Sequence, residues 1–279
     1  MAKQLTLPTN RRQLFVQAYK TAFSTLIKLS LLISLFAIPL IVLIMVKNID
    51  LSYLLAEAEN IQDFNRIYFT HDIVWNATYI PALIILSIGF CGAHYVMKAY
   101  AFGDGYTLWK TFWKGIKSDF KRCLIISVLF AVIYFLISFA HCYITILSQD
   151  WFTATYILKW VLVLFVACAY AFCVSQLPIY QGSAFRMFSN SFLLTFSSLP
   201  KSVLSITLSY LPLFIAYVVS NNILTIVIAA LYISIGFANA SLVTTLFCHE
   251  TLDKLVNENR YPEIYRKGLY DENAEQIED

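Results

Sequence analysis

Apolar and polar positions follow one pattern three times along this chain. A stripe of mostly aromatic residues with the spacing i, i+4, i+8 comes first, a basic residue follows it, and two long apolar runs come next. The stripes are Phe15/Tyr19/Phe23, Phe112/Ile116/Phe120 and Phe188/Phe192/Phe196. Because residues four apart share one face of a helix, each stripe predicts an amphipathic helix. The recurrence predicts three repeats, each an amphipathic interfacial helix followed by a helical hairpin.

Six apolar runs are long enough to cross a membrane, and none contains Asp, Glu, Lys or Arg. They are residues 29–46, 73–97, 123–147, 160–180, 203–219 and 223–247. A hydrocarbon core of ~30 Å needs about 20 helical residues, and the fifth run has only 17. The tight turn at Asn221 and Asn222 leaves either a hairpin or a partly re-entrant pair. We favour the hairpin, because unpaired backbone groups are costly in lipid.

Composition supports a membrane protein. Only 13% of the 279 residues are charged and 59% are hydrophobic, whereas soluble domains have about 25% charged residues. The net charge of +3 is too small to indicate a nucleic-acid partner. The fold class that we expect is an all-α membrane protein with six transmembrane helices.

The positions of the basic residues predict the orientation. If the N-terminus is cytoplasmic, 17 of the 20 Lys and Arg residues lie in cytoplasmic segments, and only Lys47, Arg66 and Lys159 lie outside. This bias follows the positive-inside rule and places both termini in the cytoplasm. We therefore expect a six-helix transmembrane domain at residues 1–249 and a cytoplasmic C-terminal segment at 250–279. The last nine residues, 271–279, form an acidic tail.

The polar segments between the runs differ from one another. Residues 47–72 are expected to form a long outside loop, with a short helix at 51–58 as an option. Residues 108–120 carry Lys110, Lys114 and Lys117 opposite an apolar face, with Trp109 and Trp113 beside it. Such a helix is expected at the inner face, with its lysines toward anionic lipid headgroups. The third helix has few charges, so its phenylalanines at 185, 188, 192 and 196 are expected to pack against the bundle.

Candidate chemistry is sparse. The spans contain only two ionisable residues of functional interest, His94 and His141, near opposite ends of their spans, so they cannot share a metal. His249-Glu250 begins like HExxH, but Asp253 replaces the second histidine. No GxSxG or GxxxxGK[ST] motif occurs. We predict no catalytic, cofactor-binding or metal-binding residue, and we expect the six cysteines to be buried thiols without a disulfide.

The second repeat resembles the YesL-like family of bacterial membrane proteins. The resemblance rests on the small-residue end of the second run, on a glycine-containing turn, and on a Phe-rich basic segment; these are residues 92–98, 103–106 and 112–121. The Ile38-Pro39-Leu40-Ile41 segment is similar to the proline-containing first span of that family. The resemblance implies a six-span protein of the bacterial cytoplasmic membrane. It also implies an accessory role, because genes of that family often lie near sugar-uptake genes.

Three functions stay open at this stage. The leading hypothesis is a non-enzymatic membrane protein that acts as a scaffold or accessory subunit of a membrane complex, such as a transport complex. Its partners would be anionic lipid headgroups at the inner face and a membrane protein. The alternative is a transporter or flippase for an apolar or amphipathic solute. The third hypothesis is a membrane-embedded enzyme that uses His94 and Tyr95.

Overall fold

The fold was examined in a computed structural model that describes residues 8–56, 60–219 and 222–269. These ranges are helices joined by turns and contain no strand. The prediction of an all-α protein is therefore confirmed for the described part of the chain. Five of its helical stretches are long and apolar enough to cross a membrane, or six if a bent pair counts as one span.

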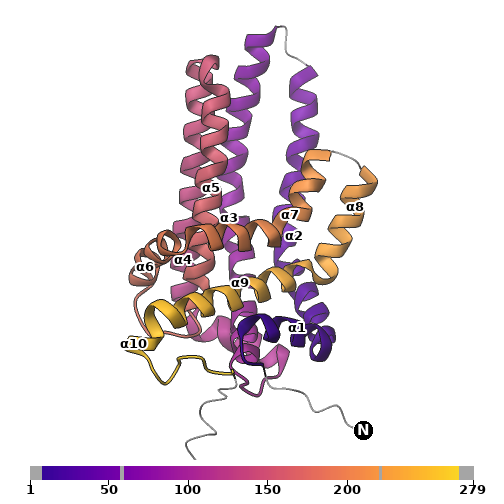
Figure 1. Cartoon of the computed structure of the whole chain (residues 1–279). Helices are drawn as coiled ribbons and strands as arrows, with labels where there is room; N and C mark the ends of the chain where they lie inside the picture. The colour runs from indigo at the N-terminus through magenta and orange to yellow at the C-terminus, as the bar shows by residue number, and fades with distance from the viewer. Residues whose placement is uncertain (1–7, 57–59, 220–221, 270–279) are drawn as a thin grey trace, which may run out of the picture.

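Four long helices dominate the arrangement. They are α2 (Phe23–Ala56), α3 (Ile61–Ala101), α4 (Leu108–Leu147) and α5 (Phe152–Gln176), and they lie beside one another (Figure 1). The shorter elements are α1 (Arg11–Thr21), α6 (Ala184–Ser197), α7 (Leu199–Val219), α8 (Asn222–Leu231), α9 (Phe237–Leu252) and α10 (Glu258–Arg260). A 3₁₀ turn, η1 (Gln149–Trp151), precedes α5, and π-helical turns η2 (Tyr232–Gly236) and η3 (Asp253–Asn257) flank α9.

The prediction of a long loop at residues 47–72 is wrong, because most of this segment is helical. Helix α2 continues to Ala56, and α3 already begins at Ile61, where the Asn60 side chain caps it by accepting from the amide of Asp63 at 2.9 Å. The segment contains no Gly or Pro, so nothing in it ends a helix early. Lys47 and Asp72 form an ion pair that joins the two extensions. Of the optional helix at 51–58, residues 51–56 belong to α2, and residues 57 and 58 lie outside the described ranges.

The last two apolar runs differ from a full-length hairpin. Helices α7 and α8 pack against each other, but their paired end reaches only part of the way along α2 to α5 (Figure 1). Helices α6 and α7 form a bent pair with an angle of 100°. Beyond α8 the chain stays helical through η2, α9 and η3 and crosses obliquely below the hairpin. Residues 226–260 are nevertheless long and apolar enough to cross a membrane by themselves. The hairpin and the partly re-entrant pair therefore both stay predictions.

Each of the three amphipathic segments ends at a similar backbone break. The φ and ψ angles are −119° and 18° at Ala22, −120° and 19° at Asp119, and −130° and 26° at Ser198. Immediately before each break, a hydroxyl donates to a carbonyl three or four residues earlier; the donors are Thr21, Ser118 and Ser197. Such bonds bend helices. The first two stripes have the same register relative to the break, whereas the third is shifted by three residues.

The stripes are buried to different extents. Phe112 and Ile116 lie in the main core, which joins α1, α2, α3, the start of α4 and α9. The expectation that the third phenylalanine face packs against the bundle is wrong at both ends, since Phe185 and Phe196 are 63% and 66% exposed. It is confirmed in the middle, where Phe188 and Phe192 are partly buried and pack against Phe130 of α4. Helix α6 also buries Ala184, Met187, Ser191, Leu194 and Thr195. The small and hydroxyl side chains allow closer helix contact, which the aromatic periodicity concealed.

Small residues and prolines shape the interiors of the helices. Gly89 approaches Phe36 so closely that an added Cβ would overlap it, which makes the Gly89/Ala93 pair a close contact between α2 and α3. Pro39, Pro81 and Pro212 lie inside helices. Pro178 does not, because α5 ends at Gln176, before the end of the predicted fourth span.

A buried ion pair closes one end of the bundle. The guanidinium of Arg11 in α1 lies 2.9 Å from Asp253, and their side chains are only 3% and 9% exposed. Arg11 also donates to the carbonyls of Ala101 and Lys267, at 3.1 Å each. The N-terminal helix, the end of α3 and the C-terminal segment therefore meet at one place. We call this part of the molecule the basic end.

We predict that Arg11→Ala destabilises the basic end by about 3–5 kcal/mol, because it leaves Asp253 buried without a counter-charge. Thermal unfolding of the detergent-purified protein measures the loss, and limited proteolysis reports earlier cleavage after residue 253. The matched control is Arg12→Ala, which removes an exposed arginine from the same helix. Equal unfolding temperatures for the two variants would contradict the role of the ion pair.

Candidate lipid-facing site at the basic end

A polar hollow of about 500 Å³ lies where α3 ends and α4 begins. Its ionisable groups include three lysines, Lys98, Lys110 and Lys114, and no carboxylate lines it. Hydroxyl groups complete the wall; they belong to Tyr95, Tyr106, Thr107, Thr111 and Ser118. We call this hollow the lysine pocket. A set of ammonium and hydroxyl donors without acidic acceptors suits an anionic group such as a phosphate.

The turn between the two helices shapes the lysine pocket. Gly103 has a φ of 69°, a conformation that favours glycine, which confirms the turn predicted at the Gly103–Gly105 segment. Thr107 then precedes α4 in extended conformation, but its side chain caps no amide, and the first turn has no acidic residue. The first amide groups of α4 are therefore without a side-chain acceptor from their cap, and their partial positive charge adds to that of the lysines.

One carboxylate beside the pocket is held by two lysines. Asp104 lies 2.9 Å from the ammonium of Lys98 and 3.5 Å from that of Lys267. Partial burial raises the pKa of Asp104, but the hydrogen bonds and charges of Lys98 and Lys267 outweigh it and hold the pKa below its ordinary value. Asp104 therefore stays ionised and remains in its ion pair with Lys98. Among the described residues, Lys110 and Lys114 make no ion pair.

The pocket continues into an exposed basic and aromatic surface on α4. A second hollow of about 600 Å³ shares Lys110, Lys114 and Ser118 with it and adds Lys117, Trp109 and Trp113. We call the surface formed by Lys110, Lys114, Lys117, Trp109 and Trp113 the lysine face. The indole of Trp109 is 61% exposed and meets Trp113 edge-on at 5.8 Å. Phe112 and Ile116, on the opposite side of the helix, are buried.

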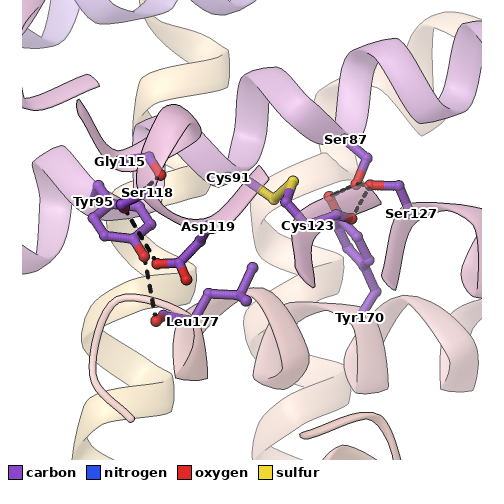
Figure 2. The surroundings of a disulfide bond; sticks show 10 residues. All are labelled: Ser87, Cys91, Tyr95, Gly115, Ser118, Asp119, Cys123, Ser127, Tyr170 and Leu177. Carbon is purple, nitrogen blue, oxygen red and sulfur yellow. Dashed lines mark hydrogen bonds between the residues drawn. A yellow bond between two sulfur atoms is a disulfide. The ribbon is translucent and has the colours of Figure 1, made fainter. Parts of the chain in front are cut away.

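The interface between α3 and α4 fixes one wall of the lysine pocket. An added Cβ at Gly115 would overlap the ring of Tyr95, so only glycine lets the two helices approach this closely. Figure 2 shows Tyr95, Gly115, Ser118 and Asp119 together at this point of the interface. Asp119 pairs with Arg122, whose guanidinium also donates to the carbonyl of Tyr180 at 3.1 Å. Helix α4 is thereby joined to the segment after α5.

A disulfide links the same two helices and corrects the expectation of free thiols. Cys91 and Cys123 are bonded, with their Cα atoms 6.6 Å apart (Figure 2). The two cysteines are 32 positions apart, so no short cysteine motif in the sequence could have predicted the disulfide. The remaining four cysteines, Cys142, Cys168, Cys173 and Cys248, are buried thiols, as predicted.

Beyond the disulfide, a mostly apolar cavity of about 210 Å³ lies among α3, α4 and α5. Ser87, Ser127 and Tyr170 contribute hydroxyls to its wall (Figure 2). The oxygen atoms of Ser127 and Ser87 lie 2.7 Å apart, and those of Ser87 and Tyr170 also lie 2.7 Å apart. The hydroxyls therefore satisfy one another, and the cavity presents mainly Leu, Phe, Ile, Val and Ala side chains.

The histidines occupy separate places. His94 is buried, and its Nδ1 lies 2.8 Å from the hydroxyl of Thr245 and 3.4 Å from that of Ser175. His141 lies near the other end of the bundle, 3.0 Å from Thr155. No group of three or more His, Cys, Asp or Glu residues in the described ranges is placed to hold a metal. Tyr95 lines the lysine pocket and His94 does not, so the two residues do not share one cavity.

Comparisons with known protein families, characterised proteins and solved structures found no significant match to this chain. The resemblance to the YesL-like family therefore stays a prediction. The lysine face was predicted from the sequence, whereas the lysine pocket beside it, with Lys98, Tyr95 and Tyr106, was not. For Tyr95 a signal existed in the i, i+4 series Ser87–Cys91–Tyr95, which faces the series Asp119–Cys123–Ser127.

We predict that Gly115→Ala destabilises the protein by about 1–3 kcal/mol, because the added methyl group overlaps the Tyr95 ring. Thermal unfolding in detergent measures the change. Adding Tyr95→Gly removes both the Cβ and the ring atoms that the new methyl group would overlap, so the double variant should lose less than the sum of the two single changes. Additive losses would show that the contact between Gly115 and Tyr95 does not limit the approach of the helices.

Proposed function

We propose that this chain is a non-enzymatic integral membrane protein that acts as a scaffold or accessory subunit of a membrane complex, such as a transport complex. It would hold its basic end against the anionic headgroups of the inner leaflet of a bacterial cytoplasmic membrane. Both termini would be cytoplasmic. The observation that carries this proposal is the lysine face, whose cations are exposed on a helix that Phe112 and Ile116 fix to the bundle.

The architecture supports this orientation. Arg11, Ala101, Asp253 and Lys267 meet at the basic end, so the segments that the charge bias assigns to the cytoplasm lie together. The three similar breaks at Ala22, Asp119 and Ser198 support a threefold repeat in which each interfacial helix turns into a span. The resemblance to the YesL-like family would be consistent with this plan.

The electrostatic contribution of the lysine face can be estimated. Each Lys near an anionic leaflet contributes about 1 kcal/mol, and a difference of ~1.4 kcal/mol corresponds to tenfold in affinity. Trp109 and Trp113 suit the headgroup level because their rings are apolar and their N–H groups are polar. The face is therefore suited to fixing the protein at the leaflet surface while its outer edge stays available to a partner.

We predict that Lys114→Gln/Lys117→Gln weakens binding of phosphatidylglycerol by roughly thirtyfold, because two cations near the headgroups are lost. Native mass spectrometry of the detergent-purified chain, titrated with phosphatidylglycerol, measures this change. The matched control, Arg66→Gln/Lys159→Gln, removes two charges from the predicted outer end and should leave binding unchanged. Equal effects of the two double variants would contradict a specific role for the lysine face.

The scaffold role predicts a stoichiometric partner. Purification of the chain at native expression in a mild detergent, followed by mass spectrometry, should recover a membrane protein at constant ratio. Recovery should fall in a variant with Trp109→Ala, which removes an exposed side chain without touching the core. A homogeneous monomer under the same conditions would argue against this function.

The alternative, a transporter or flippase for an apolar or amphipathic solute, is favoured by one observation. The cavity among α3, α4 and α5 is apolar enough to hold a hydrocarbon group, with the hydroxyl-bearing residues Ser87, Ser127, Tyr134 and Tyr170 in its wall. Reconstitution into vesicles with a fluorescent phospholipid distinguishes the functions. The scaffold predicts that the outer-leaflet fraction stays constant, whereas a flippase would change it.

A further inference from the structure

A separate groove of about 920 Å³ runs between α1, α7 and α9. Helix α9 packs against both α1 and α7, and it ends on the side of the molecule where α7 begins (Figure 1). No residue that lines this groove belongs to the lysine face or to the lysine pocket. The groove is therefore independent of the site on which the proposed function rests.

One part of the groove is apolar. Leu204 and Leu208 of α7, which are 59% and 60% exposed, lie along it with Val16 of α1 and Val243 of α9. Phe247 also contributes to the wall. Exposed aliphatic side chains around a hollow of this size suit a hydrocarbon chain, because each buried CH₂ group contributes about 0.8 kcal/mol.

The other part of the groove is basic. Arg12 lies in the first turn of α1, Lys201 lies near the start of α7, and Lys254 follows the end of α9. The carboxylate of Glu250 also lies here, but it is paired with Lys254 at 3.0 Å. Among the described residues, Arg12 and Lys201 make no ion pair. The groove therefore has two cations without an acidic partner, Arg12 and Lys201, next to its apolar part.

A buried hydroxyl lies between the two parts. Ser205, one turn after Lys201, is 9% exposed, and its Oγ atom has no hydrogen-bond partner in the described part of the chain. Serines in helices often donate to their own helix, as Ser209 does here to the carbonyl of Ser205 at 2.8 Å. A buried hydroxyl that makes no such bond costs free energy unless a ligand satisfies it.

We propose that this groove binds one anionic phospholipid. Its phosphate would lie between Arg12 and Lys201, its glycerol ester region near Ser205, and one acyl chain along Leu204 and Leu208. Basic pockets between helices at the cytoplasmic side of membrane proteins bind lipid headgroups in this way. A free phosphate would leave the apolar part empty, and an amphipathic peptide would not require the cations to cluster at one end.

The test places a photo-reactive benzophenone amino acid at position 204 of the full chain. The protein is reconstituted into vesicles of equal amounts of phosphatidylglycerol and phosphatidylcholine, illuminated, and analysed by mass spectrometry. We expect the ratio of phosphatidylglycerol to phosphatidylcholine adducts to exceed that in bulk lipid by about tenfold, because charge-assisted contacts favour the anionic lipid. The same group at position 193, which is also exposed but outside the groove, should give the bulk ratio.

Two variants sharpen the outcome. Arg12→Gln/Lys201→Gln should return the adduct ratio at position 204 to the bulk value, whereas Lys114→Gln/Lys117→Gln should leave it raised even if the lysine face fails its own test. A bulk ratio at position 204 in the unaltered background would overturn the proposal. So would a polypeptide adduct at position 204 when the labelled protein is illuminated in cells.

Discussion

The ion pair between Arg11 and Asp253 is the constraint on which the rest of the structure depends. Both groups are almost completely buried, and a buried charge is stable only when its hydrogen-bonding capacity is satisfied. The carbonyls of Ala101 and Lys267 supply the remaining acceptors. Because these four residues come from α1, from the end of α3 and from the C-terminal segment, the pair holds these three parts of the chain and the surfaces beside them together.

The surfaces at the basic end share one physical design, in which one side of a helix is fixed and the other is left open. Helix α4 buries Phe112 and Ile116 and exposes three lysines; α1 buries Leu14 and Ala18 and exposes Arg12 to the groove. The interface between α3 and α4, with Gly115 against Tyr95 and the bond from Cys91 to Cys123, makes the position of the lysine pocket rigid. If the surface binds anionic lipid as proposed, a fixed helix position would lower the ordering cost of binding.

Local periodicity predicted the helices, the Gly103 turn and the lysine face, because these depend on residues a few positions apart. Contacts between distant segments were not predictable in that way. Arg11 resembles Arg12 in sequence, yet only Arg11 is buried; the difference depends on Asp253, 242 residues later. The helical extensions of α2 and α3 were missed because polar residues were interpreted as a loop, although the segment lacks Gly and Pro. The third stripe was correct only in part. Phe188 and Phe192 pack against Phe130, but α6 also packs through residues outside the stripe, such as Met187.

The central claim is that the basic end, with the lysine face and the groove, is a single cytoplasmic surface. Labelling with a membrane-impermeant maleimide tests it most directly, using Lys110→Cys at the basic end and Asp150→Cys in the exposed turn between α4 and α5. The native cysteines in this part of the chain are buried or disulfide-bonded. The account predicts that Asp150→Cys is labelled in intact cells and Lys110→Cys only after the membrane is opened. Labelling of Lys110→Cys in intact cells would contradict it.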